Sequence, residues 1–261
     1  MITLVSNPMN PELSAFCRQD IFGSRVYTGL QAYGTGFPFF SVWQQADGRN
    51  QLTAVLCALD GQATLYAAEN AEAEELAAFI HMQGFNSVFC SCQNALMLEL
   101  PATREGAILI HEDKSRLRVR HAVDFEPPGQ AVYELLSEAD GPWVKLPPFD
   151  VWYADVNHRI RHGACTMAAV MEGDKALSCG MILSDGIALS LLGGVATHPD
   201  HQGHGYAGSV ISALLEVLYK KQKTPYLFRD KGKNQRFYEN LGFAPVGKWA
   251  LCESQELSFR N

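Results

Sequence analysis

The chain has 261 residues, of which 47% are hydrophobic and 19% charged, so it can bury the cores of about two ordinary domains. Acidic residues outnumber basic ones by 28 to 21, and the resulting net charge of −7 argues against nucleic-acid and membrane-surface binding. Seven cysteines without C-x-x-C spacing suggest neither a disulfide framework nor a zinc site. We therefore expect a cytoplasmic protein with reduced thiols, no bound metal and no membrane span.

The first half of the chain is predicted to contain a helix, three strands, a second helix and a fourth strand. In chain order these elements are expected at residues 11–17, 37–45, 52–59, 63–67, 71–83 and 85–90. Asp47-Gly48 and Asp60-Gly61 are typical of hairpin turns. In the second helix, Leu76, Phe79 and Ile80 form an apolar stripe that indicates a buried face.

A domain boundary is predicted near residues 121–129, where Pro127 and Pro128 cannot continue a helix or a central strand. Just before it, residues 114–120 alternate basic and apolar side chains. This alternation could bind nucleic acid, but it favours a solvated edge strand because the rest of the chain is not basic. We thus expect one domain over residues 1–120 and another over residues 121–261.

The second half repeats the order of the first. A helix is expected at 130–137, strands at 163–170, 176–183 and 187–197, a long helix at 206–221, a strand at 226–228 and a short helix at 234–240. Short turns at 172–175 and 184–186 require antiparallel neighbours. The repeat predicts an α/β (α+β) protein of two modules, each with a mixed, mostly antiparallel sheet flanked by helices.

Residues 195–208 carry the clearest functional signal, because a strand leads through a glycine-bearing turn directly into a helix. Such a turn points several unpaired amide N–H groups at one spot, at the positive end of the helix dipole. Gly203 and Gly205 have no Cβ, so an anion can approach the backbone closely. A phosphate or diphosphate is the expected ligand.

One interpretation of this loop is a dinucleotide site, and thus an NAD-dependent oxidoreductase. Gly203, Gly205 and Gly208 fit G-x-G-x-x-G, and Asp230 follows at about the distance of the acidic residue that binds ribose. However, residues 198–202 intervene between the strand and the first glycine. The preceding strands are hairpin-linked rather than parallel, which disfavours a doubly wound domain.

The second interpretation rests on two motifs. Gln202-Gly-His-Gly-Tyr-Ala207 resembles the Gln/Arg-x-x-Gly-x-Gly/Ala motif of the GCN5-related N-acetyltransferase (GNAT) family, and Phe237-Tyr238 with Gly242-Phe243 resembles its later Phe-Tyr-x-x-x-Gly-Phe element. The resemblance covers roughly residues 145–247. It implies two GNAT-like domains in tandem, of which only the second, at 121–261, binds acetyl-CoA.

Carried onto this sequence, the resemblance implies direct transfer of an acetyl group from acetyl-CoA to a primary amine, on a small molecule or on a protein. The backbone of Val195, Ala196 and Thr197 would pair with the pantetheine arm as an added strand. The backbone amides of six residues would hold the diphosphate: Gln202, Gly203, His204, Gly205, Tyr206 and Ala207. Tyr238 matches the tyrosine that protonates the departing thiolate.

The sequence also departs from the family. Lys231 stands where many members have asparagine, with Asn234 as a displaced substitute, and Tyr226 stands where some have a glutamate base. No general base is therefore assigned. These departures keep a second function open, a CoA-binding sensor without turnover.

Three further segments have competing interpretations. His198, His201 and His204 could bind a metal, but their spacing across a loop and a helix start favours the family interpretation. Residues 152–163 are interpreted as an ion-paired start of a strand, or else as a substrate wall. The strand–helix junction at 67–76 has no glycine and four glutamates, so the first domain is expected to have lost cofactor binding.

Overall fold

The computed structural model describes residues 1–139 and 146–253, and its contacts divide the chain into two compact units. Unit 1 contains residues 1–109, residues 228–233 and the chain from Pro245. Unit 2 contains residues 110–227 and 234–244. Each unit is described by itself. The predicted division of the chain into domains 1–120 and 121–261 stays a prediction.

Unit 1 contains a mixed sheet that is mostly antiparallel. Its helices and strands are β1 (Ile2–Leu4), α1 (Pro11–Cys17), α2 (Ile21–Tyr33), β2 (Phe40–Ala46), β3 (Leu52–Leu59), β4 (Gln62–Ala67), α3 (Ala73–Gln83), β5 (Ser87–Ser91), α4 (Cys92–Met97) and the start of β6 (Arg104–His111). The hydrogen-bonded order is β1-β2-β3-β4-β5-β11-β6, where β11 is the last strand of the chain (Phe243–Glu253). Among the strand pairs β1–β2, β2–β3, β3–β4, β4–β5 and β5–β11, only β4–β5 is parallel.

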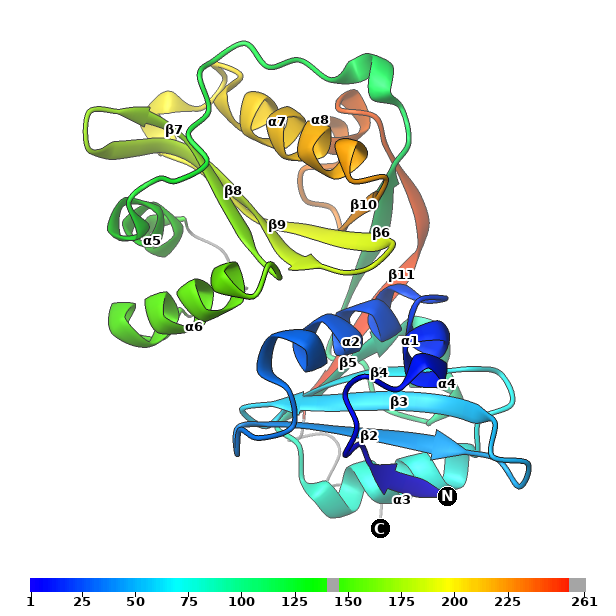
Figure 1. Ribbon diagram of the computed structural model, residues 1–261. Helices are drawn as coiled ribbons and strands as arrows, with labels where there is room; N and C mark the ends of the chain where they lie inside the picture. The colour runs from blue at the N-terminus through cyan, green and yellow to red at the C-terminus, as the bar shows by residue number, and fades with distance from the viewer. Residues whose placement is uncertain (140–145, 254–261) are drawn as a thin grey trace. The chain divides into compact units, whose positions relative to one another are not determined.

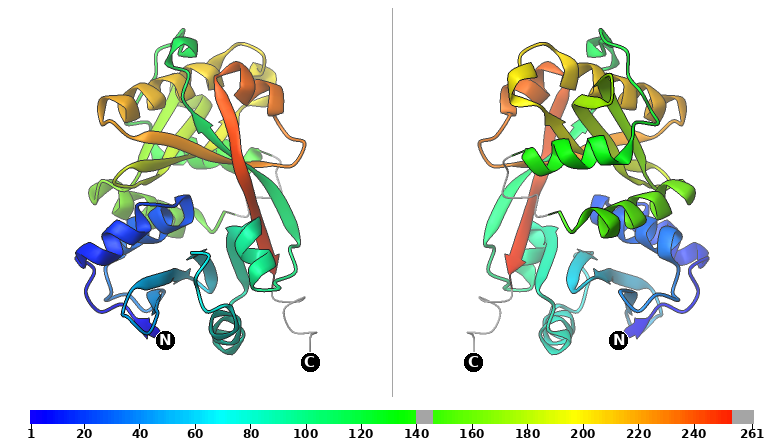
Figure 2. Two further views of the ribbon diagram at one scale, coloured as in Figure 1. Left: turned by 90° about the vertical axis from the view of Figure 1, so that its right-hand side faces the viewer. Right: turned by 90° about the vertical axis from the view of Figure 1, so that its left-hand side faces the viewer.

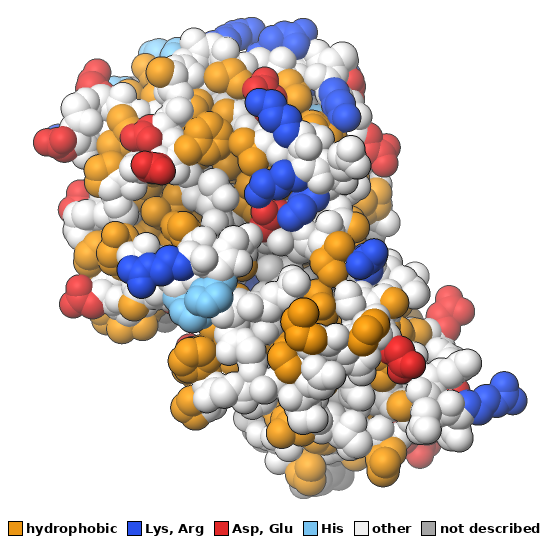
Figure 3. All heavy atoms as spheres, viewed as in Figure 1, with side chains coloured by type: hydrophobic (Ala, Val, Ile, Leu, Met, Phe, Trp, Pro, Cys, Tyr) orange, Lys and Arg blue, Asp and Glu red, His pale blue; other side chains and the backbone are white. Residues whose placement is uncertain are grey.

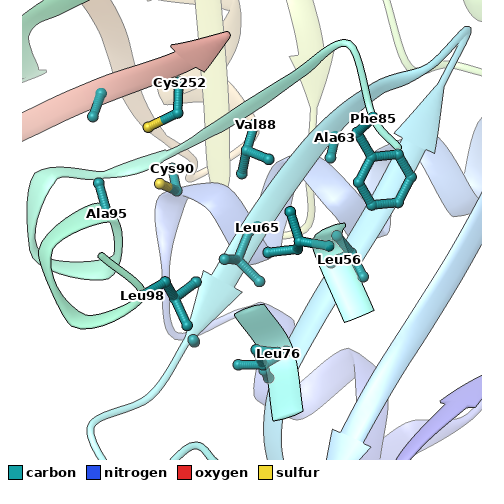
Figure 4. Close-up of a cluster of buried hydrophobic side chains, with 14 residues drawn as sticks. Leu56, Ala63, Leu65, Leu76, Phe85, Val88, Cys90, Ala95, Leu98 and Cys252 are labelled. Carbon is teal, nitrogen blue, oxygen red and sulfur yellow. The ribbon is translucent and has the colours of Figure 1, made fainter. Parts of the chain in front are cut away.

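Helices cover both faces of the unit 1 sheet, with α1 and α2 on one face and α3 on the other (Figures 1 and 2). The α3 side holds a core in which Leu56 and Leu65 of the sheet pack with Leu76 of the helix (Figure 4). Cys252 of β11 belongs to the same core and is fully buried next to Cys90. The last strand of the chain is therefore part of the interior of unit 1.

Unit 2 repeats the order of elements. It contains η1 (Lys114–Arg116), α5 (Gly129–Glu138), α6 (Phe149–Arg161), β7 (Thr166–Glu172), β8 (Lys175–Asp185), β9 (Leu189–Thr197), η2 (Pro199–His201), α7 (Tyr206–Lys220), most of β10 (Thr224–Asp230), α8 (Gln235–Asn240) and the first residues of β11. Strands β7, β8 and β9 are antiparallel neighbours, and β10 pairs with β9 in parallel. The predicted mixed, mostly antiparallel fold is thus confirmed for both units.

Helix α7 covers one face of the unit 2 sheet, and α5 and α6 cover the other (Figure 1). A Cβ at Gly180 of β8 would lie 2.9 Å from Val210 and 3.4 Å from Leu214, so α7 lies close against the strand there. On the opposite face, Trp152 and Val156 of α6 pack into a core with β7 and β8. The two helical layers fix the end of β9 and the start of α7, where the predicted loop lies.

Two expectations for unit 2 were wrong. Residues 152–163 were expected to begin a strand, but α6 runs from Phe149 to Arg161. Trp152 and Val156 recur at the helical spacing i, i+4, and Asp155 pairs with Arg159 one turn later at 2.7 Å. Residues 114–120 form the short helix η1 and an irregular segment instead of an edge strand.

Candidate functional site

The end of β9 separates from β10 at the point where the motif begins. The parallel register joins Leu189–Leu192 to Thr224–Leu227, whereas β9 continues to Thr197. Just beyond Leu192, the antiparallel register between β9 and its other neighbour, β8, shifts, and Gly194 has a φ of +58° at this point. A bulge bends its strand. Among the described residues, the predicted Val195, Ala196 and Thr197 have no register partner on the β10 side of β9.

Two left-handed glycines shape the loop between β9 and α7. Gly203 and Gly205 have φ values of +80° and +82°. A Cβ at Gly203 would meet nothing within 4 Å, and one at Gly205 would only approach Nε2 of His121, at 4.0 Å. The space beside the loop backbone is therefore open, and glycine is needed there for the backbone conformation.

A row of backbone amides in this loop has no acceptor within the described part of the chain. Gln202 donates its N–H to the carbonyl of Pro199 at 3.3 Å, and Ser209 donates to Gly205 at 3.0 Å. Between them, the N–H groups of residues 203–208 make no hydrogen bond to any described residue. They stand at the N-terminus of the 15-residue helix α7, whose dipole favours an anion there. Of the six predicted diphosphate ligands, only Gln202 has its amide engaged.

The loop histidines are placed by ring contacts. His201 packs against His198 with ring centroids 5.5 Å apart, and His204 stacks on Tyr206 at 5.9 Å. Among residues 1–139 and 146–253, no group of three or more His, Cys, Asp or Glu side chains could hold a metal ion.

Tyr238 lies half-buried on α8, edge-on to Phe243 with centroids 5.7 Å apart. The end of α8 is fastened by His111, whose Nε2 donates to the carbonyl of Leu241 at 2.8 Å. Leu241 also approaches α7, because a Cβ at Gly208 would lie 3.8 Å from its Cδ2. The helix that carries Tyr238 therefore ends against the first turn of the helix that carries the amide row.

Burial keeps the two cysteines near β9, Cys179 and Cys165, in the thiol form. Burial raises the pKa of Cys179, whose thiol donates to the carbonyl of Gly194, to about 12. Burial likewise raises the pKa of Cys165 to about 11. Both side chains are therefore neutral thiols at physiological pH, which suits a reaction without a covalent cysteine intermediate.

At the two positions where the sequence departs from the family, the structure offers no carboxylate. Tyr226 on β10 is fully buried, and Lys231 is exposed. The acidic residue of the rejected dinucleotide motif, Asp230, instead forms an ion pair with Arg104 at 3.4 Å within unit 1.

His121 is a residue near the loop that sequence analysis missed. Its ring packs on Tyr206 with centroids 4.4 Å apart, and its Nε2 lies 3.0 Å from the carbonyl oxygen of His204. No local pattern signals this contact, because the two hydrogen-bonded residues are 83 positions apart.

In the corresponding region of unit 1, side chains bond to the backbone at two places. Strand β4 pairs in parallel with β5 from Gln62 to Thr64, and beyond this register the side chain of Asn94 binds the backbone of Ala67. Its amide accepts from the N–H of Ala67 at 3.1 Å and donates to the carbonyl of the same residue at 2.8 Å. At the start of α3, Gln45 accepts from the N–H of Glu72 at 3.0 Å. The N–H groups of residues 73–75, at the start of α3, make no hydrogen bond to any described residue, so unit 1 differs from unit 2 in its glutamates and its missing glycines rather than in having all its amides paired.

A comparison with protein families matches residues 150–245 to the acetyltransferase (GNAT) domain. The match begins with α6 and ends within β11, so it contains the loop, α7 and α8. No match to the chain was found among curated proteins.

Solved structures resemble the whole chain in fold. A tandem GNAT protein from the clavulanic acid biosynthesis pathway has a TM-score of 0.62 at 12% identity, with 97% of this chain and 98% of that chain covered. A GCN5-related N-acetyltransferase from Sphaerobacter thermophilus has a TM-score of 0.63 at 13% identity, covering 96% and 94%. A GNAT-family acetyltransferase from Colwellia psychrerythraea has a TM-score of 0.58 at 16% identity, covering 97% and 99%.

The described residues contain no helix that is long and apolar enough to span a membrane.

Proposed function

Because residues 150–245 form a GNAT acetyltransferase domain in a chain with the fold of tandem GNAT proteins, we propose that this protein transfers an acetyl group from acetyl-CoA to a primary amine. The observation that carries the proposal is the open row of amides at residues 203–208, next to the free end of β9. The acceptor is an amine on a small molecule or on a protein.

The amide row fits a diphosphate. Gly203, His204, Gly205, Tyr206 and Ala207 provide N–H donors, and the dipole of α7 adds to their positive potential. Gln202 differs because its N–H already donates to the carbonyl of Pro199. Its amide could bind the diphosphate only after that hydrogen bond is broken. The glycines leave no Cβ in the way of the phosphate oxygens.

The end of β9 beyond its register with β10 fits the pantetheine arm of acetyl-CoA, which contains amide groups. Val195, Ala196 and Thr197 extend beyond the register with β10, so they can pair with an added extended chain. In this arrangement the thioester, which is the acetyl donor, would lie beside the strand. The chain's main contribution is then to hold the thioester and the amine at attacking distance.

In the proposed reaction the neutral amine nitrogen attacks the thioester carbon, and the carbon–sulfur bond breaks. The phenol of Tyr238 gives its proton to the leaving thiolate, and the nitrogen releases a proton to water that restores the phenol. No carboxylate is assigned as a base. A general acid of this kind contributes about a hundredfold or more to the rate.

Binding is tested with Gly205→Asp, which places a side chain and a negative charge in the amide row. We expect its affinity for CoA in calorimetry to fall at least about a hundredfold, because a carboxylate would repel the diphosphate and fill its space. Gly173→Asp is the matched control, since Gly173 is also left-handed, in unit 2 and open around its Cβ position. Unchanged CoA affinity in Gly205→Asp would contradict the site.

Turnover is tested by following thiol release from acetyl-CoA with a panel of amines. In Tyr238→Phe we expect kcat to fall about a hundredfold while the affinity for CoA stays unchanged, because only the proton donor is lost. The exposed Tyr153, changed to Phe, is the control. CoA binding without turnover on any amine would identify a sensor rather than an enzyme.

A further inference from the structure

A segment from outside the glycine motif follows α7 to the amide row. Between η1 and α5 the chain runs along α7 toward its N-terminus (Figure 1). We call residues 117–121 of this segment the strap. Two serines of α7 fasten it, because the N–H of Arg118 donates to Ser212 at 3.0 Å and that of Arg120 donates to Ser209 at 3.1 Å. Both serines are buried, so these attachments are shielded from water.

The strap ends at His121, which contacts the loop by two independent interactions. Its ring packs on the first residue of α7, Tyr206, and its Nε2 lies 3.0 Å from the carbonyl oxygen of His204. Since a carbonyl only accepts, Nε2 must carry the hydrogen. No described residue makes a hydrogen bond to Nδ1 of His121.

The bond to His204 controls the direction of the next amide. The carbonyl of His204 and the N–H of Gly205 belong to one planar trans peptide, so they point in opposite directions. Because His121 holds the carbonyl oxygen of His204 toward its own ring, the N–H of Gly205 in the same peptide group points away from that ring. Gly205 is the residue at which the backbone is most free to rotate away, because glycine accepts many conformations.

We propose that His121 is a positioning residue for the diphosphate site: its Nε2–H fixes the His204–Gly205 peptide so that the Gly205 N–H faces the bound phosphate. The inference rests on the proposed function, because it assumes that the amide row binds CoA. It assigns a role in that site to the strap, which lies outside the matched family domain.

Charged and titratable side chains surround His121. The titratable and charged groups of the neighbouring elements are Arg118 and Arg120 on the strap, Asp124 beyond it, His198, Asp200, His201 and His204 in the loop, and Tyr206 on α7. Lys, Arg and His side chains gather along the upper edge of the view in Figure 3.

The test is calorimetric binding of 3′-dephospho-CoA, whose diphosphate does not change charge between pH 6 and 8. His121→Phe keeps the ring on Tyr206 but removes the donor, and we expect affinity at pH 8 to fall roughly three- to tenfold. His121→Gln restores an N–H near the position of Nε2, so affinity at pH 8 should return to within about twofold.

His81→Gln is the control, because His81 lies on the exposed side of α3 in unit 1 and should not change the affinity for dephospho-CoA. A second readout needs no ligand: the NMR signal of the Gly205 amide in glycine-labelled protein should move in His121→Phe and return toward its original position in His121→Gln. Thermal unfolding of each variant shows whether it is folded.

The outcomes separate the two proposals. If the wild-type protein binds dephospho-CoA and Gly205→Asp does not, but His121→Phe binds normally with an unmoved Gly205 signal, the role of His121 is wrong and the site stands. If His121→Gln is as weak as His121→Phe, the donor is not the cause and the positioning role is also overturned. If the wild-type protein binds neither CoA nor dephospho-CoA, both proposals fail.

Discussion

His111 shows how one buried side chain can fasten the element that carries the proposed acid. Its exposed fraction is 1%, and its two ring nitrogens contact Tyr219 of α7 and the carbonyl of Leu241 at the end of α8. Burial lowers the pKa of His111 below its ordinary value of 6.5, although the hydrogen bond to Leu241 acts in the opposite direction. The folded protein therefore prefers the neutral ring.

This preference makes stability depend on pH. Between the lowered pKa and 6.5 the unfolded chain takes up a proton that the folded chain refuses, so this contribution is present above pH 6.5 and lost as the pH falls below it. We expect His111→Phe to cost about 1–3 kcal/mol of unfolding free energy at pH 7.5, because it leaves the partly buried carbonyl of Leu241 without its donor.

Urea unfolding of both proteins at pH 7.5 and pH 5 measures the effect. The difference between wild type and His111→Phe should shrink at pH 5, while the exposed His81→Gln should follow the wild type at both values. A difference that grows in acid would show that His111 prefers the charged form in the folded state.

At the scale of elements, helix α7 has three roles. Its apolar face packs on the sheet, its N-terminus carries the open amides, and its serines Ser209 and Ser212 hold the strap. The hydroxyl of Ser209 accepts from Arg120 and donates to the carbonyl of Gly205 at 3.3 Å. Ser209, which the sequence predicts only as a helix residue, therefore connects the strap to the loop.

We expect the double variant Ser209→Ala and Ser212→Ala to loosen the strap, since each lost hydrogen bond is worth about 0.5–1.5 kcal/mol. Trypsin should then cut after Arg118 and Arg120 several-fold faster than in the wild type, as followed by mass spectrometry. Ser137→Ala is the control, because its hydroxyl bonds only within α5. Equal cutting rates in all three proteins would mean that the serines do not hold the strap.

Features that depend on neighbouring residues in the sequence could be predicted, and features that depend on distant contacts could not. The loop at 195–207 could be found because its glycines follow from the backbone conformation that the turn itself requires. His121 could not, because its place depends on the path of the strap along α7. Helix α6 was misread since alternating histidines and arginines suggested a strand, whereas burial of Trp152 and Val156 decided for a helix.

At the scale of the whole molecule, the two units are not consecutive stretches of chain. Strand β11 gives its first residues to unit 2 and continues from Pro245 in unit 1, where it pairs with β5 from Trp249 to Glu253. Trp249 is fully buried and packs with Phe22 and Ile108. A strand from the end of the chain thus completes the first unit, which no local pattern in the first half could indicate.

A fragment of residues 1–120, the predicted first domain, tests this dependence. We expect no cooperative thermal unfolding, because the fragment lacks Trp249 and leaves the edge of β5 without its partner. The same fragment joined by a flexible linker to residues 243–253 should regain cooperative unfolding and dispersed amide signals. Cooperative unfolding of residues 1–120 alone would support the predicted boundary instead.

The Asn94 side chain marks a difference between the two units. It makes two hydrogen bonds to the backbone of Ala67, and Gln45 accepts a hydrogen bond from the N–H of Glu72 at the start of α3. Replacing Asn94 would leave the backbone groups of Ala67 without these hydrogen bonds, and it would not supply the left-handed glycines that shape the loop of unit 2. The difference between the two units therefore lies in the backbone conformation of their loops as well as in the side chains beside them.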